Sequence, residues 1–133
     1  MMPRALCPTG LSAPVGPYSH AVLGGEQIHV SGLLALAEDG SLVGANDAEA
    51  QARHIFALLS RILEGVGSDL RHVVKLTFFL TDLQDRFALN QVRSEIFGEW
   101  RPASTLVQVA GLIGDGTLME IEAIATLAES PVS

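Results

Sequence analysis

The chain has 133 residues, 48% hydrophobic and 17% charged, which suits one core in a single domain over 1–133 and argues against disorder. Fifteen acidic against eight basic residues give a net charge of −7, which disfavours binding to nucleic acid. No apolar run approaches the about 20 residues that cross a bilayer. The lone Cys7 and the lack of a secretory signal favour a cytoplasmic protein without disulfides.

The N-terminal third predicts a flexible segment followed by a β-hairpin. Residues 1–11 show no period and are expected to form a flexible lead-in. Two short runs, 19–23 and 27–36, flank the turn-forming pair Gly24-Gly25, and the second run alternates apolar and polar residues. This pattern is typical of two paired strands.

A helix is predicted next. Asn46 is the expected N-cap, with Glu49 reaching back to it in a capping box. Apolar residues recur at helical spacing over 52–66, and Gly65 and Gly67 stand where a C-terminal cap is expected.

The second half predicts three strands and one helix. Residues 73–80 are almost continuously apolar, which favours a strand covered on both faces. Asp82 begins a helical stretch that ends near Gly98, and 104–109 and 118–127 have strand character. The order β-β-α-β-α-β-β indicates an α+β fold in which two helices pack on one face of a mixed sheet.

Several motifs, taken together and in order, resemble the Rid (YjgF/L-PSP) family. They cover the chain from Ala13 to Ala125. No single motif is specific, but the complete series on the predicted elements is. The motifs are Ala13-Pro14-Val15-Gly16-Pro17-Tyr18-Ser19-His20-Ala21, Val30-Ser31-Gly32, Gln51, Val73-Val74-Lys75, Phe79-Leu80-Thr81-Asp82, Asn90, Pro102-Ala103-Ser104-Thr105 and Glu120-Ile121-Glu122-Ala123-Ile124-Ala125.

The resemblance implies a chorismate-mutase-like fold assembled as a homotrimer, with the three sheets in a central barrel and three clefts between subunits. A mean hydropathy of +0.35 independently favours apolar surface buried between subunits, although a generous core is the alternative. In the family's best-known members the cleft hydrolyses reactive enamines and imines to keto acids and ammonia. Its partner is thus a small-molecule ligand, and no cofactor is implied.

The most informative departure from the family is Ser104. It stands where an arginine of the family's Pro-Ala-Arg-Ser motif holds the substrate carboxylate. A serine hydroxyl is one neutral donor, whereas a guanidinium grips a carboxylate through two charged hydrogen bonds. We therefore expect weak activity on 2-imino acids. Arg93, at a position where an aromatic residue is common, and Arg101 are candidate substitutes, and the sequence leaves open whether either one acts.

Glu120 is the candidate catalytic residue. It and Glu122 lie two apart on a predicted strand and therefore point to one face. A desolvated carboxyl has a raised pKa and serves as an acid or base near neutral pH. The alternative is that both are solvated or paired with basic residues. The resemblance gives Glu120 the water-positioning place, and Glu122 is interpreted as structural.

The candidate substrate-binding residues are Tyr18, Ser31, Gly32, Asn90 and Ser104, each from a motif of the resemblance. Each has a plain structural alternative. The tyrosine could pack over the hairpin, the serine-glycine pair could form a β-bulge, and the asparagine could satisfy a buried backbone group.

Two kinds of function remain open. The first is a Rid-like enzyme that hydrolyses or tautomerises a reactive enamine, imine or related metabolite, with Glu120 and a water moving the proton. The second is a non-catalytic, metabolite-binding or specialised-pathway member of the family. RNA cleavage suits this acidic chain poorly, and the four histidines lack metal-ligand spacing, so no metal site is expected. The sequence does not identify the physiological substrate.

Overall fold

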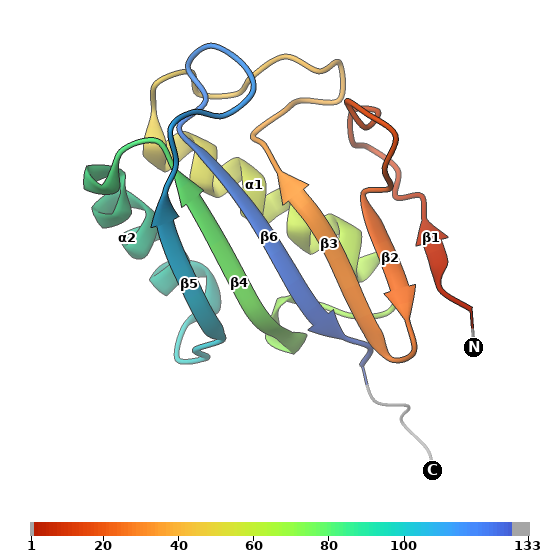
Figure 1. Ribbon diagram of the computed structural model, residues 1–133. Coiled ribbons are helices and arrows are strands. Elements are labelled where there is room, and N and C mark those ends of the chain that lie inside the picture. Colours follow the sequence, from red (N-terminus) through yellow and green to blue (C-terminus); the bar gives the residue numbers. More distant parts are fainter. Residues whose placement is uncertain (1, 129–133) are drawn as a thin grey trace.

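A computed structural model describes residues 2–128 of the chain (Figure 1). Six strands form one sheet, and two α-helices and two short 3-10 helices, 70–72 and 83–85, connect them. In chain order the main elements are β1 (Arg4–Leu6), β2 (Ala21–Gly24), β3 (Gln27–Leu33), α1 (Ala48–Glu64), β4 (Val73–Leu80), α2 (Arg86–Phe97), β5 (Ala103–Gln108) and β6 (Met119–Thr126).

The sheet has the strand order β1-β2-β3-β6-β4-β5. Strands β4 and β5 are parallel, as their connection through α2 requires, and every other neighbouring pair is antiparallel. The last strand, β6, lies in the middle of the sheet between β3 and β4 (Figure 1). The predicted α+β fold with a mixed sheet is therefore confirmed.

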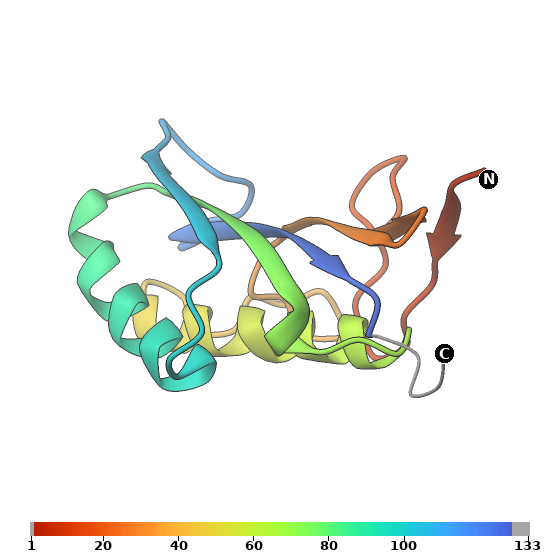
Figure 2. The ribbon, with the colours of Figure 1, turned by 90° about the horizontal axis from the view of Figure 1, so that it is seen from below.

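Both helices cover the same face of the sheet (Figure 2). Alternate residues of β6, from Met119 to Ala125, point to that face and are buried with Phe56 of α1 and Phe78 of β4. The opposite face is open in this chain, and Glu122 on it is exposed. The expectation that β4 is covered on both faces is thus not met within one chain, because its outward residues alternate with buried ones and are only partly buried.

Helix α1 begins one residue later than expected. Asp47, not Asn46, is the N-cap, and its carboxylate accepts a hydrogen bond of 3.0 Å from the Ala50 amide. Asn46 has a φ of 59°, in the left-handed region, whereas an N-cap is extended. Glu49 does not close a capping box, because it falls one position short of the required spacing, and it lies 3.7 Å from Arg53 instead.

The N-terminal segment contains a strand that the sequence pattern did not reveal. Within the predicted lead-in of residues 1–11, β1 pairs with β2 in antiparallel register, with Ala5 opposite Val22. Only Leu6 of its three residues is buried, so the strand is too short to show an alternating pattern.

Gln51 of α1 ties two distant loops together. The side chain is fully buried, and its amide donates to the carbonyls of Gly44 at 2.9 Å and Gly116 at 2.8 Å. Its Oε1 accepts from the Leu118 amide at 2.9 Å. One neutral side chain thus supplies the two donors and the acceptor that these buried backbone groups require. The Gln51 amide therefore has a structural role.

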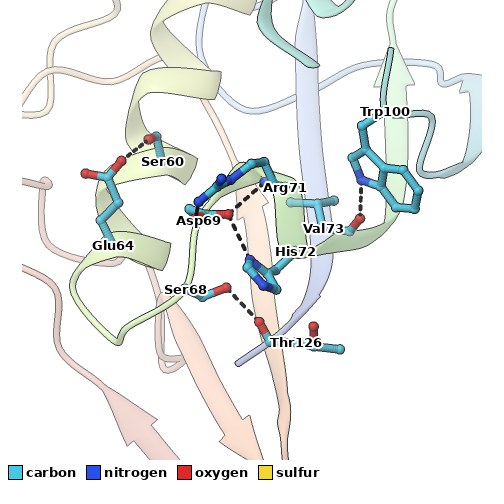
Figure 3. Close-up of polar contacts among 9 residues, drawn as sticks. All are labelled: Ser60, Glu64, Ser68, Asp69, Arg71, His72, Val73, Trp100 and Thr126. Atoms are coloured by element: carbon cyan, nitrogen blue, oxygen red, sulfur yellow. Dashed lines mark hydrogen bonds and ion pairs between the residues drawn. The ribbon is translucent and has the colours of Figure 1, made fainter. Parts of the chain in front are cut away.

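The connection from α1 to β4 is held by side-chain bonds (Figure 3). Ser68 donates to the carbonyl of Thr126 on β6 at 2.6 Å. Asp69 bonds the Arg71 guanidinium at 2.7 Å and the His72 ring at 2.8 Å, and these two hydrogen bonds hold the pKa of its carboxyl well below the usual range. These hydrogen bonds fix the position of the segment from which β4 begins.

Candidate functional site

Glu120 lies on the open face of β6, opposite Phe79 of β4. It is half-buried, and burial raises the pKa of its carboxyl, with a smaller contribution from the charge of Glu122 two residues along the same face. A partly desolvated carboxyl of this kind is suited to hold and release a proton near neutral pH.

A β-bulge brings the backbone of β3 against Glu120. The pairing of β3 with β6 slips by one residue between Val30 and Leu33, so Ser31 and Gly32 form the bulge that was one of the two predicted alternatives. A Cβ atom at Gly32 would lie 2.6 Å from Cδ of Glu120. A side chain at position 32 would therefore displace the Glu120 carboxyl from its present place.

The Ser31 hydroxyl is engaged in the fold. It donates to the carbonyl of Ser19 at 2.6 Å, and the amide of Ser31 donates to the carbonyl of His20 at 2.9 Å. These bonds tie the bulge to the segment that leads into β2. The serine thus orients the bulge from within one chain.

Tyr18 lies in the loop before β2, and 45% of it is exposed. Its hydroxyl accepts from the amide of Val15 at 3.4 Å. Tyr18 and Gly32 line the same small hollow of about 30 Å³, about the size of one water molecule. The loop is thus packed beside the β3 bulge that contacts Glu120.

The remaining two candidates, Asn90 and Ser104, meet at a different place. They line a cavity of about 460 Å³ between α2 and β5. Asn90 and Ser104 are both exposed. Among residues 2–128 the side-chain amide of Asn90 makes no hydrogen bond that would give it a structural role. The register of β5 places Ser104 opposite Leu76 of β4, on the helix-covered side of the sheet.

Arg93 reaches this cavity from α2. Its Nη1 donates a hydrogen bond of 2.9 Å to the Ser104 hydroxyl, and its Cζ lies 4.8 Å from the centre of the Phe78 ring. Burial lowers the pKa of the Arg93 guanidinium, and the nearby charge of Arg101 lowers it further. A guanidinium remains charged at neutral pH all the same.

Arg101 and Trp100 close the end of the cavity beyond α2. The Arg101 guanidinium donates to the carbonyls of Gly98 and Trp100. The Trp100 indole donates to the carbonyl of Val73 at 2.9 Å, which anchors this wall to the start of β4 (Figure 3).

Within one chain the predicted site residues therefore form two groups. Glu120, Gly32 and Tyr18 gather around the β3 bulge, and Asn90 and Ser104 gather at the α2–β5 cavity. Neither Glu120 nor Tyr18 lines that cavity.

Asn90 and Arg93 of the cavity wall were candidates from the sequence, whereas Ser94, Phe97 and Trp100 were not. The α2 residues of the wall, 90, 93, 94 and 97, follow one another mostly at intervals of three and four residues. That spacing places side chains on one helix face and was available from the sequence. The part played by Trp100 depends on its bond to β4, which no local pattern indicates.

Two classes of function receive no support from the described residues. Between residues 2 and 128, no three His, Cys, Asp or Glu side chains are grouped to hold a metal ion. Over the same range, no helix has the length and apolar character needed to span a membrane.

This architecture is that of a small α+β protein with a cavity beside the edge strand β5 of its sheet. Comparison with known proteins identifies the family to which the chain belongs. The profile of the Endoribonuclease L-PSP family matches residues 10–127, nearly the whole chain. The chain belongs to this family, which is the Rid/YjgF family of the sequence resemblance.

Relatives match over almost their full length. A protein named 3-aminoacrylate deaminase RutC from Acinetobacter baylyi is 39% identical over 125 residues, which cover 93% of this chain and 98% of the relative. RidA from an Antarctic Psychrobacter is 34% identical, with a TM-score of 0.87 over 93% of this chain and 99% of that structure. Escherichia coli TdcF with bound serine is 29% identical, with a TM-score of 0.86 over 94% and 99%.

Proposed function

We propose that this protein is a deaminase-type hydrolase that acts on small enamines or imines. Membership of the family and the likeness to a 3-aminoacrylate deaminase support the reaction class. The observation that carries the proposal is the half-buried Glu120 carboxyl, which has a raised pKa and lies against the glycine of the β3 bulge. A carboxyl in this state can take a proton from water and return it.

The chemistry needs only water and one acid–base group. An enamine first gains a proton at carbon and becomes an iminium ion. The Glu120 carboxylate then takes a proton from water as the oxygen bonds to the iminium carbon, which gives a neutral carbinolamine. The protonated Glu120 returns that proton to the carbinolamine nitrogen, the C–N bond breaks, and the hydroxyl proton passes to the departing ammonia. One iminium ion and one water give one carbonyl compound and one ammonium ion.

The proposal includes a site shared between copies of the chain. The Glu120 group and the α2–β5 cavity are separate within one chain, and the open face of the sheet carries Glu120 without a cover. A homotrimer with intersubunit clefts would place both groups in one site. Tyr18, Ser31, Gly32, Asn90 and Ser104 are the proposed substrate-binding residues.

Ser104 limits the proposed substrate range. Its neutral hydroxyl cannot replace the two charged hydrogen bonds of a guanidinium at the same position. Unless another residue holds the carboxylate, we therefore expect slower turnover of 2-imino acids than in family members that keep an arginine there.

The test is to generate imines in place with an amino-acid oxidase or an amine oxidase and to follow ammonia release. We expect the wild-type chain to accelerate release, and Glu120→Gln to abolish the acceleration because it keeps the shape and removes the proton acceptor. Glu26→Gln, at the exposed hairpin turn, is the matched control and should remain active. Equal rates for wild type and Glu120→Gln would contradict the proposed role of Glu120.

The second candidate function is binding without turnover. It is favoured by the structural relative solved with serine bound, which shows that an amino acid can occupy a protein of this fold. A ligand-induced rise in melting temperature without any ammonia release would support this second function.

A further inference from the structure

The cavity between α2 and β5 carries positive charge that nothing in the described chain balances. Arg93 and Arg101 line it, and none of its other lining residues is acidic. The ion pairs among residues 2–128 involve neither of these two arginines. Two guanidinium groups without a carboxylate are notable in a chain with fifteen acidic residues, because acidic partners are abundant elsewhere on its surface.

Arg93 is held in one orientation by contacts from two strands. The Ser104 hydroxyl of β5 accepts from its Nη1, and the Phe78 ring of β4 lies beside its guanidinium. The bond to Ser104 uses one of five N–H donors. The other donors, together with the hydroxyl hydrogen of Ser104, are available to a ligand.

The serine at position 104 and the arginine at position 93 fit each other. An arginine at 104 would bring a second positive charge to the place that the Arg93 guanidinium now reaches, and like charges at short range repel. A serine is small and neutral, and its oxygen accepts the hydrogen bond. The guanidinium thus comes to this part of β5 from α2, where the family arginine would come from the strand itself.

The cavity also suits a particular ligand. Its volume of about 460 Å³ lies within the range of small-molecule sites. A planar guanidinium binds a carboxylate through two parallel hydrogen bonds. Phe97 and Trp100 offer apolar surface, and Asn90 offers an amide.

We propose that Arg93, oriented by Ser104, binds the carboxylate of the substrate, so that this site takes small anionic imines or enamines with a short apolar remainder. The inference rests on the function proposed above and names its substrate class. Arg93 is then a substrate-binding residue and Ser104 a positioning residue.

The experiment measures binding and turnover separately. Calorimetry with pyruvate, and with methyl pyruvate as its uncharged counterpart, reports anion binding, and hydrolysis of 2-iminopropionate reports turnover. Arg93→Gln should weaken pyruvate binding about tenfold or more and leave methyl pyruvate unaffected. It should also raise KM far more than it lowers kcat. Arg93→Lys should be intermediate, because lysine keeps the charge and loses the planar fork.

Two further variants sharpen the test. Arg4→Gln, on the exposed part of β1, removes the same charge away from the cavity and should bind pyruvate as wild type does. Introducing Ser104→Arg into the Arg93→Gln background should recover pyruvate binding, because it returns the guanidinium to the same cavity from the strand side.

The outcomes separate this inference from the proposed function. Pyruvate binding that depends on Arg93 supports the inference even where the wild type hydrolyses no imine, a result that would remove only the proposed function. An unchanged affinity for pyruvate in Arg93→Gln overturns the inference and leaves the function standing. Dissociation of an oligomer in Arg93→Gln, measured by light scattering, would also overturn it, because the guanidinium would then pair with another subunit.

Discussion

At the scale of single residues, Glu120 and Glu122 are neighbouring carboxylates on one face of β6. Burial of Glu120 contributes most to its raised pKa, and the charge of Glu122 adds to it. A base with a raised pKa is protonated, and therefore inactive, at a higher pH than an exposed glutamate would be. If Glu120 is the reacting base, as proposed, the acid side of the activity profile reports its environment.

Glu122→Gln should move that acid limb to lower pH. The substitution removes the like charge, so the pKa of Glu120 falls and its carboxylate persists further into the acid range. The shift should be partial, because the larger contribution from burial remains. The measurement is kcat/KM against pH for both proteins. A limb that stays in place would mean that Glu122 has no electrostatic effect on the reacting base.

At the scale of elements, the buried side-chain amide of Gln51 joins the start of α1 to two loops, the one that contains Gly44 and the one that contains Gly116. A carboxylate of the same shape would lose both donors to the carbonyls of Gly44 and Gly116 and would bring a buried charge. Gln51→Glu should therefore lower the free energy of unfolding by about 3 kcal/mol.

Urea denaturation at one fixed protein concentration checks this prediction, since stability of an oligomer depends on concentration. Gln91→Glu, on the exposed surface of α2, is the matched control and should change the unfolding midpoint little. Equal midpoints for the two variants would remove the structural role assigned to Gln51.

The same scale shows what sequence patterns can and cannot predict. Helix α1 and strand β4 were predictable because their buried positions are apolar and recur regularly over many consecutive residues. The N-cap was placed one residue early because Asn46 and Asp47 have equal capping chemistry, and only the positive φ of Asn46 decides between them.

The sequence indicated which residues are candidates for the site, but it did not indicate how they are arranged in space. The bulge at Ser31 and Gly32 was one of two interpretations, and its approach to Glu120 depends on the pairing of β3 with β6. The bond from Arg93 to Ser104 joins a helix to a strand eleven residues later. Such contacts follow from the packing of elements, which local periodicity does not encode.

At the scale of the whole molecule, the open sheet face predicts assembly. It presents outward residues of β4 and β6, and Val107 of β5 lies 40% exposed beside them. The partly exposed apolar side chains among them, such as Phe79 and Ile124, are of a kind that another subunit typically covers. We expect a homotrimer at micromolar concentration, which sedimentation would establish, and a stable monomer would sink both the trimer and the shared cleft.

A pair of variants locates the proposed interface. Val107→Glu places a charge on the open face and should shift the sedimentation coefficient toward the monomer, because a buried unpaired charge is costly. Phe87→Glu alters a still more exposed hydrophobic residue on α2, which the resemblance places on the outside of the trimer, and should leave assembly intact. The reverse result would assign the interface to the helical side.

The position of β6 has a consequence for how the protein is made. The ribosome synthesises the chain from its N-terminus, so β1 to β5 all emerge before β6. Yet β6 is the strand that lies between β3 and β4 in the sheet. Until β6 arrives, β3 and β4 each expose an edge that lacks its partner, and such edges are prone to pair with other chains. The strand β6 must therefore be synthesised before the sheet can close, and a nascent chain stalled ahead of Met119 should be a client for chaperones.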